Sequence, residues 1–85
     1  MKAYPLPKLQ EWEQFDEFVA ALQKMGWNPT QKADGPDARS WAFSREADLL
    51  WLVFDDMLGG SLKSENQTMN LKAVAAQLDV FLAKV

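Results

Sequence analysis

The run Leu49–Phe54 constrains the fold of this chain more than any other segment, because all of its residues are apolar. Projected as a helix at about 100° per residue, the run places Leu52 in the arc that also holds Asp48 and Asp56, so no clean apolar face results. The run is rich in aromatic and branched residues, and turn residues precede it at Arg45–Asp48. The sequence therefore predicts a buried strand here.

A helix is the alternative for the same region. Ser44 would cap it, Glu46 and Asp48 would occupy its first turns, and Gly59 would end it. That reading makes the whole chain a three-helix bundle. We prefer the strand, because the helical projection mixes apolar and acidic side chains.

Two segments on either side of this region have helical periodicity. Apolar residues recur every three or four positions from Leu9 to Met25, and Gly26 is suited to end the helix. The range Leu71–Val85 carries a second apolar stripe, and Ser64, Thr68 and Asn70 are candidate caps for it; the stripe consists of Leu71, Val74, Ala75, Leu78, Phe81, Leu82 and Val85.

The remaining segments predict two further strands and a loop. Trp27–Lys32 reads as a short edge strand weakened by Pro29, and Arg39–Ser44 follows the turn Asp34–Asp37 as a second strand. Gly59–Gln67 reads as a flexible connection. We therefore expect one α+β domain over residues 1–85 with the order α-β-β-β-α, in which two helices cover one face of a three-stranded antiparallel meander.

Part of this pattern is similar to the double-stranded-RNA-binding domain. The stretch Gly35–Trp41 resembles the first hairpin of that family without its histidine, and Leu71–Val85 resembles its alanine-rich last helix. The resemblance implies the same α-β-β-β-α order. The family grips phosphates with a lysine cluster before the last helix, whereas only Lys63 and Lys72 lie near that point here. Nucleic-acid binding is therefore an alternative function, not the leading one.

The chain has no histidine and no cysteine, which removes the usual acid-base catalyst near neutral pH and the strongest nucleophile. Asp55 and Asp56 are adjacent at the predicted strand end, so their carboxylates should point to opposite faces and not share a metal ion. We therefore expect no catalytic residue, no bound metal and no cofactor.

Acidic residues are concentrated in the middle of the chain. Residues 34–56 hold six acids and two arginines, while the whole chain has a net charge of −3. An acidic edge with aromatic neighbours is a means of meeting a basic partner protein. We expect Glu46, Asp48, Asp55 and Asp56 to steer the partner, and Trp27, which follows a helix end, to be partly exposed as its anchor.

This reasoning predicts a non-catalytic protein-binding module that occupies a partner's surface, as inhibitors carried by phages or mobile elements and immunity proteins do. The alternatives are the nucleic-acid-binding protein described above and a structural subunit that self-associates through an apolar surface. No apolar run reaches the length of a membrane span, no signal-peptide core follows Met1, and no disulfide can form. We expect a cytoplasmic protein without membrane contact.

Overall fold

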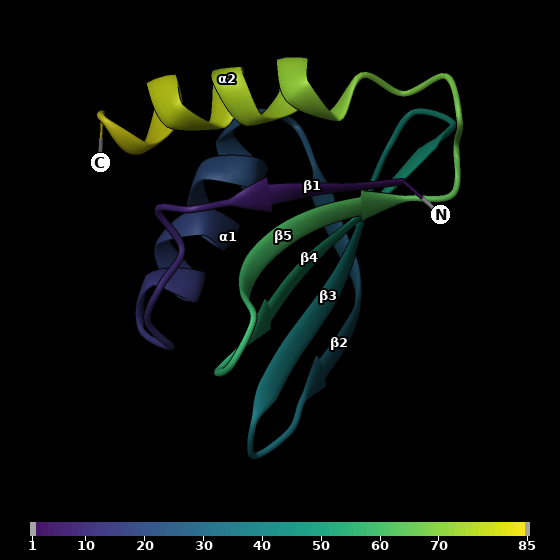
Figure 1. The fold of residues 1–85 in the computed structure, drawn as a ribbon. Coiled ribbons are helices and arrows are strands. Elements are labelled where there is room, and N and C mark those ends of the chain that lie inside the picture. Colours follow the sequence, from purple (N-terminus) through teal and green to yellow (C-terminus); the bar gives the residue numbers. More distant parts are fainter. Residues whose placement is uncertain (1, 85) are drawn as a thin grey trace.

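The computed structural model, which describes residues 2–84, has the element order β-α-β-β-β-β-α (Figure 1). All pairings between neighbouring strands of its single sheet are antiparallel, in the order β1-β5-β4-β3-β2. The elements are β1 (Lys2–Leu6), α1 (Gln14–Lys24), β2 (Asn28–Asp34), β3 (Ala38–Arg45), β4 (Asp48–Asp55), β5 (Gly59–Ser64) and α2 (Leu71–Leu82). The α+β class is confirmed, and the three-helix bundle is wrong.

The expected meander of three strands is correct in its order but too small. Strands β2, β3 and β4 pair as predicted, and β2 is an edge strand whose residues are mostly exposed. The sheet gains β5 and β1, so it has five strands and differs from the α-β-β-β-α order of the double-stranded-RNA-binding domain. Gly59–Ser64, which the sequence suggested as part of a flexible connection, is β5, because both of its edges find partners in β4 and β1.

The first helix begins later than its apolar spacing suggests. Leu9 is fully buried, but it lies in the turn before α1, where its carbonyl accepts a hydrogen bond from the Gly60 N–H (3.1 Å). The Gln14 side chain accepts hydrogen bonds from the N–H groups of Gln10 (2.7 Å) and Glu11 (3.0 Å) just before the helix. A tertiary contact with β5 therefore decides the conformation of this turn.

The second helix follows its prediction closely. Among the candidate caps, Asn70 is the one used, because its side chain accepts a hydrogen bond from the Ala73 N–H (3.0 Å). Ser64 instead lies at the end of β5, fully buried. Val85, the last member of the predicted stripe, lies outside the described residues.

A single core lies between the helices and one face of the sheet. Leu50, Leu52 and Phe54 point inward from β4 and are at most 1% exposed, and Leu62 joins them from β5. Both helices contribute to the same cluster, α1 most deeply through Phe15, Ala21 and Leu22, and α2 through Leu78. Figure 1 shows α2 lying along β1, with α1 on the same side of the sheet. No helix within residues 2–84 has the length and apolar character needed to cross a bilayer.

Candidate functional site

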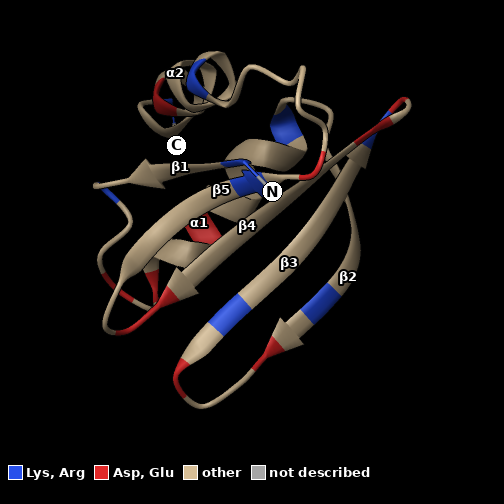
Figure 2. Cartoon of the chain, turned by 45° about the vertical axis from the view of Figure 1, so that its right-hand side comes forward, with Lys and Arg blue, Asp and Glu red and all other residues tan. Residues whose placement is uncertain are grey.

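The fold gathers acidic side chains at one end of the sheet. The β2–β3 turn and the β4–β5 turn lie at this end, because successive antiparallel strands reverse direction. The start of α1 lies here too, since Asp16 in its first turn pairs with Arg39 of β3 (3.1 Å). We call this region the acidic end; its members are Glu11, Glu13, Asp16, Asp34, Asp37, Asp55 and Asp56. Figure 2 shows red segments at both of these turns.

The two turns of the acidic end are fixed to each other. The backbone N–H of Asp56 donates to the carbonyl of Asp37 (3.1 Å), which ties the β4–β5 turn to the β2–β3 turn. One carboxylate oxygen of Asp55 accepts hydrogen bonds from the N–H groups of Met57 (2.8 Å) and Leu58 (3.1 Å). Asp55 therefore holds the turn in shape, and Asp56 is the exposed carboxylate of the pair.

Two large apolar side chains protrude from this ordered turn. Met57 is 92% exposed and Leu58 is 88% exposed, well above the next most exposed large apolar residue, Val80 at 54%. Exposure of apolar side chains to water is unfavourable, and apolar side chains that cluster on a surface are typical of interaction sites. We call Met57 and Leu58 the apolar tip. The sequence pattern did not single out these two residues, although an apolar pair between Asp55-Asp56 and Gly59-Gly60 is unusual for a turn.

Besides Lys32 of β2, which lies over the Trp41 ring, the acidic end holds a second cation, Arg39. It is only 8% exposed, and its guanidinium carbon lies 4.4 Å from the ring centre of Phe15, with Trp12 and Trp41 at 5.5 and 5.6 Å. Its Nε donates to Asp34 Oδ1 (2.8 Å), and its Nη1 lies 3.1 Å from Asp16 Oδ1. Arg39 thus joins the carboxylates of two elements to an aromatic cluster.

These contacts shift the pKa of two groups. The hydrogen bond from Arg39, followed by one from the Trp41 indole N–H (3.0 Å), lowers the pKa of Asp34. Burial of the Arg39 guanidinium by itself favours the neutral form, but Asp34 and Asp16 outweigh burial and raise the pKa of Arg39. Both groups are therefore charged throughout the neutral range.

The other predicted site residues lie at the opposite end of β4. Glu46 and Asp48 are in or beside the β3–β4 turn, about 23 Å along the strand from Asp55. Glu46 adopts a left-handed backbone conformation there (φ 57°). The structure thus divides the four predicted steering carboxylates into two pairs at opposite ends of the sheet.

Trp27 is not the partly exposed anchor that the sequence suggested. Its side chain belongs to the core and is 1% exposed, and the Arg45 guanidinium carbon lies 4.5 Å from its ring centre. The residue after the helix turns inward because the Trp27 N–H donates to the Leu22 carbonyl (3.0 Å). Trp27 and Asp48 do border the same polar hollow of about 370 Å³ beside the start of α2.

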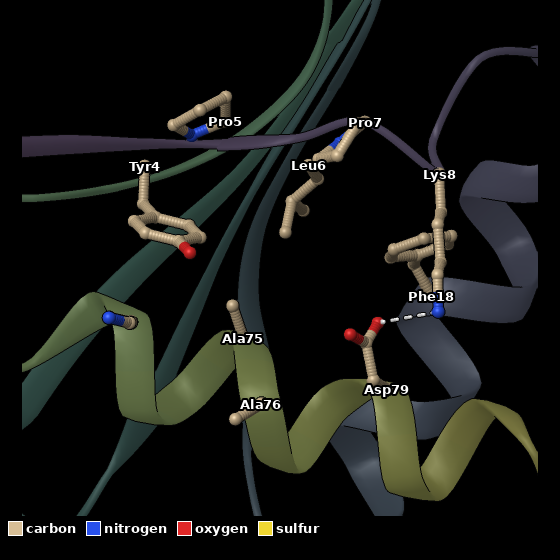
Figure 3. A pocket seen from close by; sticks show the side chains of 10 residues that line it. Tyr4, Pro5, Leu6, Pro7, Lys8, Phe18, Ala75, Ala76 and Asp79 are labelled. Atoms are coloured by element: carbon tan, nitrogen blue, oxygen red, sulfur yellow. Dashed lines mark ion pairs between the residues drawn. The ribbon is translucent and has the colours of Figure 1, made fainter.

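A separate apolar pocket of about 230 Å³ lies between β1 and α2. Leu6 and Ala75 point toward each other across it, and the ion pair between Lys8 and Asp79 (3.7 Å) closes one end (Figure 3). Tyr4 lies at the other end. Among the described residues that line this pocket, Tyr4 carries the one hydroxyl group, and there is no serine or threonine. Its groups are suited to holding a small apolar moiety.

Within residues 2–84, no group of three or more carboxylates is arranged to hold a metal ion. Comparison of the chain with protein families, with curated proteins and with solved structures finds no match. The candidate site is an ordered, strongly acidic end that carries an exposed apolar tip.

Proposed function

We propose that this protein is a non-catalytic protein-binding module, which docks its acidic end and apolar tip onto a basic surface of a partner protein. The observation that carries the proposal is the exposure of Met57 (92%) and Leu58 (88%) in a turn surrounded by carboxylates. The absence of histidine and cysteine from the sequence also favours action by occupancy over catalysis. This is how an inhibitor or an immunity protein works.

The two parts of the site have different physical roles. The apolar tip supplies area that loses water on contact, at about 25 cal/mol per Å². The carboxylates attract a basic partner from a distance, which raises the association rate and discriminates against acidic proteins. The hydrogen bonds to Asp55 and between Asp56 and Asp37 order the turn before binding, so less conformational entropy is lost in the complex.

The residues expected to contact the partner differ from those that the sequence suggested. Asp56 remains a steering residue, and Asp55 becomes a positioning residue that shapes the turn. Met57 and Leu58 take the role of anchor that the sequence suggested for Trp27. Glu46 and Asp48 are too distant to share an interface centred on the tip.

The test is affinity capture of partners from source cells with wild-type protein and three double variants. The first variant, Met57→Ser with Leu58→Ser, removes the tip. The second, Asp37→Lys with Asp56→Lys, reverses two charges at the acidic end. The third, Glu46→Lys with Glu65→Lys, makes the same change in net charge at the opposite end and serves as the matched control.

A protein that binds the wild type and the control, but not the tip variant, supports the proposal. Its association rate with the charge-reversed variant should fall about tenfold or more at low salt and approach that of the wild type at high salt. Equal capture by all four proteins contradicts the assignment of this site. Loss of binding in the Glu46 and Glu65 control alone would move the interface to the other end of β4.

A further inference from the structure

The sheet has a second face that the helices do not cover, here called the outer face. Along β4, Leu49, Trp51 and Val53 point to this face, since they alternate with the buried residues of the core. Leu49 is 42% exposed, and Trp51 and Val53 are half-buried. Figure 2 shows β3 and β4 with α1 behind them.

The sequence of β4 does not match one-sided burial. A strand with one face in water normally alternates apolar and polar residues, whereas a continuous apolar run is typical of a strand covered on both faces. The run Leu49–Phe54 is apolar throughout, yet α1 and α2 cover only its inward residues. The composition of β4 therefore indicates that something packs on the outer face.

The outer face has a self-complementary shape. The three large side chains of β4 form a ridge, here called the β4 ridge. Beside it, β3 places only small residues on the same face, with Ala42 as the covered floor at 1% exposed; this β3 trough consists of Ala38, Ser40, Ala42 and Ser44. The strand register places Leu49 beside Ser44, Trp51 beside Ala42 and Val53 beside Ser40, so ridge and trough run side by side.

We propose that the outer face binds a second copy of this chain in a two-fold symmetric dimer, with the β4 ridge of each copy in the β3 trough of the other. A two-fold axis requires a surface that fits itself, and a ridge beside a parallel trough satisfies that condition. Two sheets packed in this way lie about 10 Å apart with their strands about 30° from parallel.

Charge favours a second copy over a strongly charged partner. Neither the β4 ridge nor the β3 trough contains a charged residue. Their charged neighbours on this face include Lys63, which is paired with Trp51, and Asp55, which is paired with Ala38 at the acidic end. Two chains of net charge −3 can therefore meet at the centre of this face without opposing carboxylates, since Asp55 lies at its end. The acidic end lies at the edge of the face, where a dimer leaves the apolar tip free.

The area of the outer face limits the size of the dimer interface. Strands spaced about 4.8 Å apart and residues about 3.3 Å apart give a five-stranded face of about 24 by 20 Å, or about 500 Å² per copy. Two copies thus bury about 1,000 Å², which is the lower limit for a specific interface. We expect a dimer that forms at tens to hundreds of micromolar and dissociates on dilution.

The experiment is sedimentation velocity over a concentration series from about 5 to about 500 μM, a range that spans the expected dissociation constant. The wild type should shift from the monomer mass of 9.6 kDa toward twice that value. Val53→Lys places a charge in the β4 ridge and should raise the dissociation constant more than tenfold. Val80→Lys makes the same change at an exposed position of α2 and should alter it less than twofold.

A second variant guards against misfolding of Val53→Lys. Ser40→Lys adds a charge to the β3 trough without removing an apolar contact, and it should also prevent the dimer while retaining the wild-type circular dichroism spectrum. A wild type that stays monomeric over the whole series overturns the proposal. So does a dimer that survives both substitutions, or one that Val80→Lys disrupts equally.

This inference is independent of the proposed function. The tip variant, Met57→Ser with Leu58→Ser, should lose the partner protein and still dimerise. Val53→Lys should lose the dimer and still bind the partner with one tip per chain. Failure of the proposed function would therefore appear in partner capture, and failure of the dimer proposal would appear in sedimentation.

Discussion

Replacement of Gly60 by alanine should destabilise the protein strongly, although the change adds one methyl group. Gly60 lies in β5 on the inward face, directly beneath the fully buried side chain of Leu9. A Cβ atom at position 60 would lie 2.5 Å from both Cβ and Cγ of Leu9. Carbon atoms are most favourably placed about 3.5–4.0 Å apart, so Leu9 must move by about 1 Å or more.

The structure leaves Leu9 little freedom to move. Its carbonyl is bound to the Gly60 N–H (3.1 Å), so the same residue that clashes also anchors its backbone. Overpacking of this kind costs about 1–3 kcal/mol, and expulsion of the leucine costs a similar amount in lost burial. We expect Gly60→Ala to lower the free energy of unfolding by about 2–3 kcal/mol and the melting temperature by about 10–20 °C.

Urea unfolding followed by circular dichroism provides the measurement, with Gly35→Ala as the matched control. A Cβ atom at position 35 meets only the Ala38 carbonyl at 3.6 Å, which is an ordinary contact. That variant should be neutral or stabilised by up to about 1 kcal/mol through a less flexible unfolded chain. The reasoning is refuted if both variants have the same stability, or if adding Leu9→Ala to Gly60→Ala brings no compensation in a double-mutant cycle.

Two further predictions concern Arg39 and its partners. In urea unfolding, Arg39→Ala should lower the free energy of unfolding by about 3 kcal/mol and Arg39→Met by about 1 kcal/mol. Methionine retains the apolar contacts with the aromatic cluster, and the ion pairs with exposed carboxylates add little stability. Equal losses in the two variants would contradict this reasoning. Because the pKa of Asp34 is lowered in the folded state, its stabilising effect is complete above its ordinary value of 3.8 and is lost as the pH falls through the lower folded value. The stability difference between wild type and Asp34→Asn should therefore be constant from about pH 5 to 7 and shrink below about pH 4, and a constant difference down to about pH 2 would show that the shift is absent.

The two proposed surfaces assign different roles to the exposed apolar residues Met57, Leu58 and Leu49. Met57 and Leu58 lie in a turn among carboxylates, which suits a charged partner that arrives by attraction. Leu49 belongs to the β4 ridge, which like the β3 trough contains no charged residue, and this suits a neutral and self-complementary surface. A dimer would present two apolar tips and so raise its avidity for any partner with two matching sites.

The sequence by itself determined the elements whose signals are local. The apolar run Leu49–Phe54, the stripe beginning at Leu71 and the turn at Asp34–Asp37 each predicted the correct element, because periodicity and turn chemistry act over a few residues. The acidity of the middle of the chain was also visible, and with it the presence of Asp55 and Asp56 in a candidate site.

Only the tertiary structure decided where these elements meet. Leu9 fits helical spacing but is drawn into a turn by Gly60, and Gly59–Gly60 begins a strand because β4 and β1 offer hydrogen bonds on both sides. Trp27 is buried, since the chain after α1 turns toward the core. Strand β4 runs from one end of the sheet to the other, so Glu46 and Asp48 lie far from Asp55 and Asp56. Pairing between distant residues leaves no local mark on a sequence, so the acidic end, its apolar tip and the open outer face exist only in the folded chain.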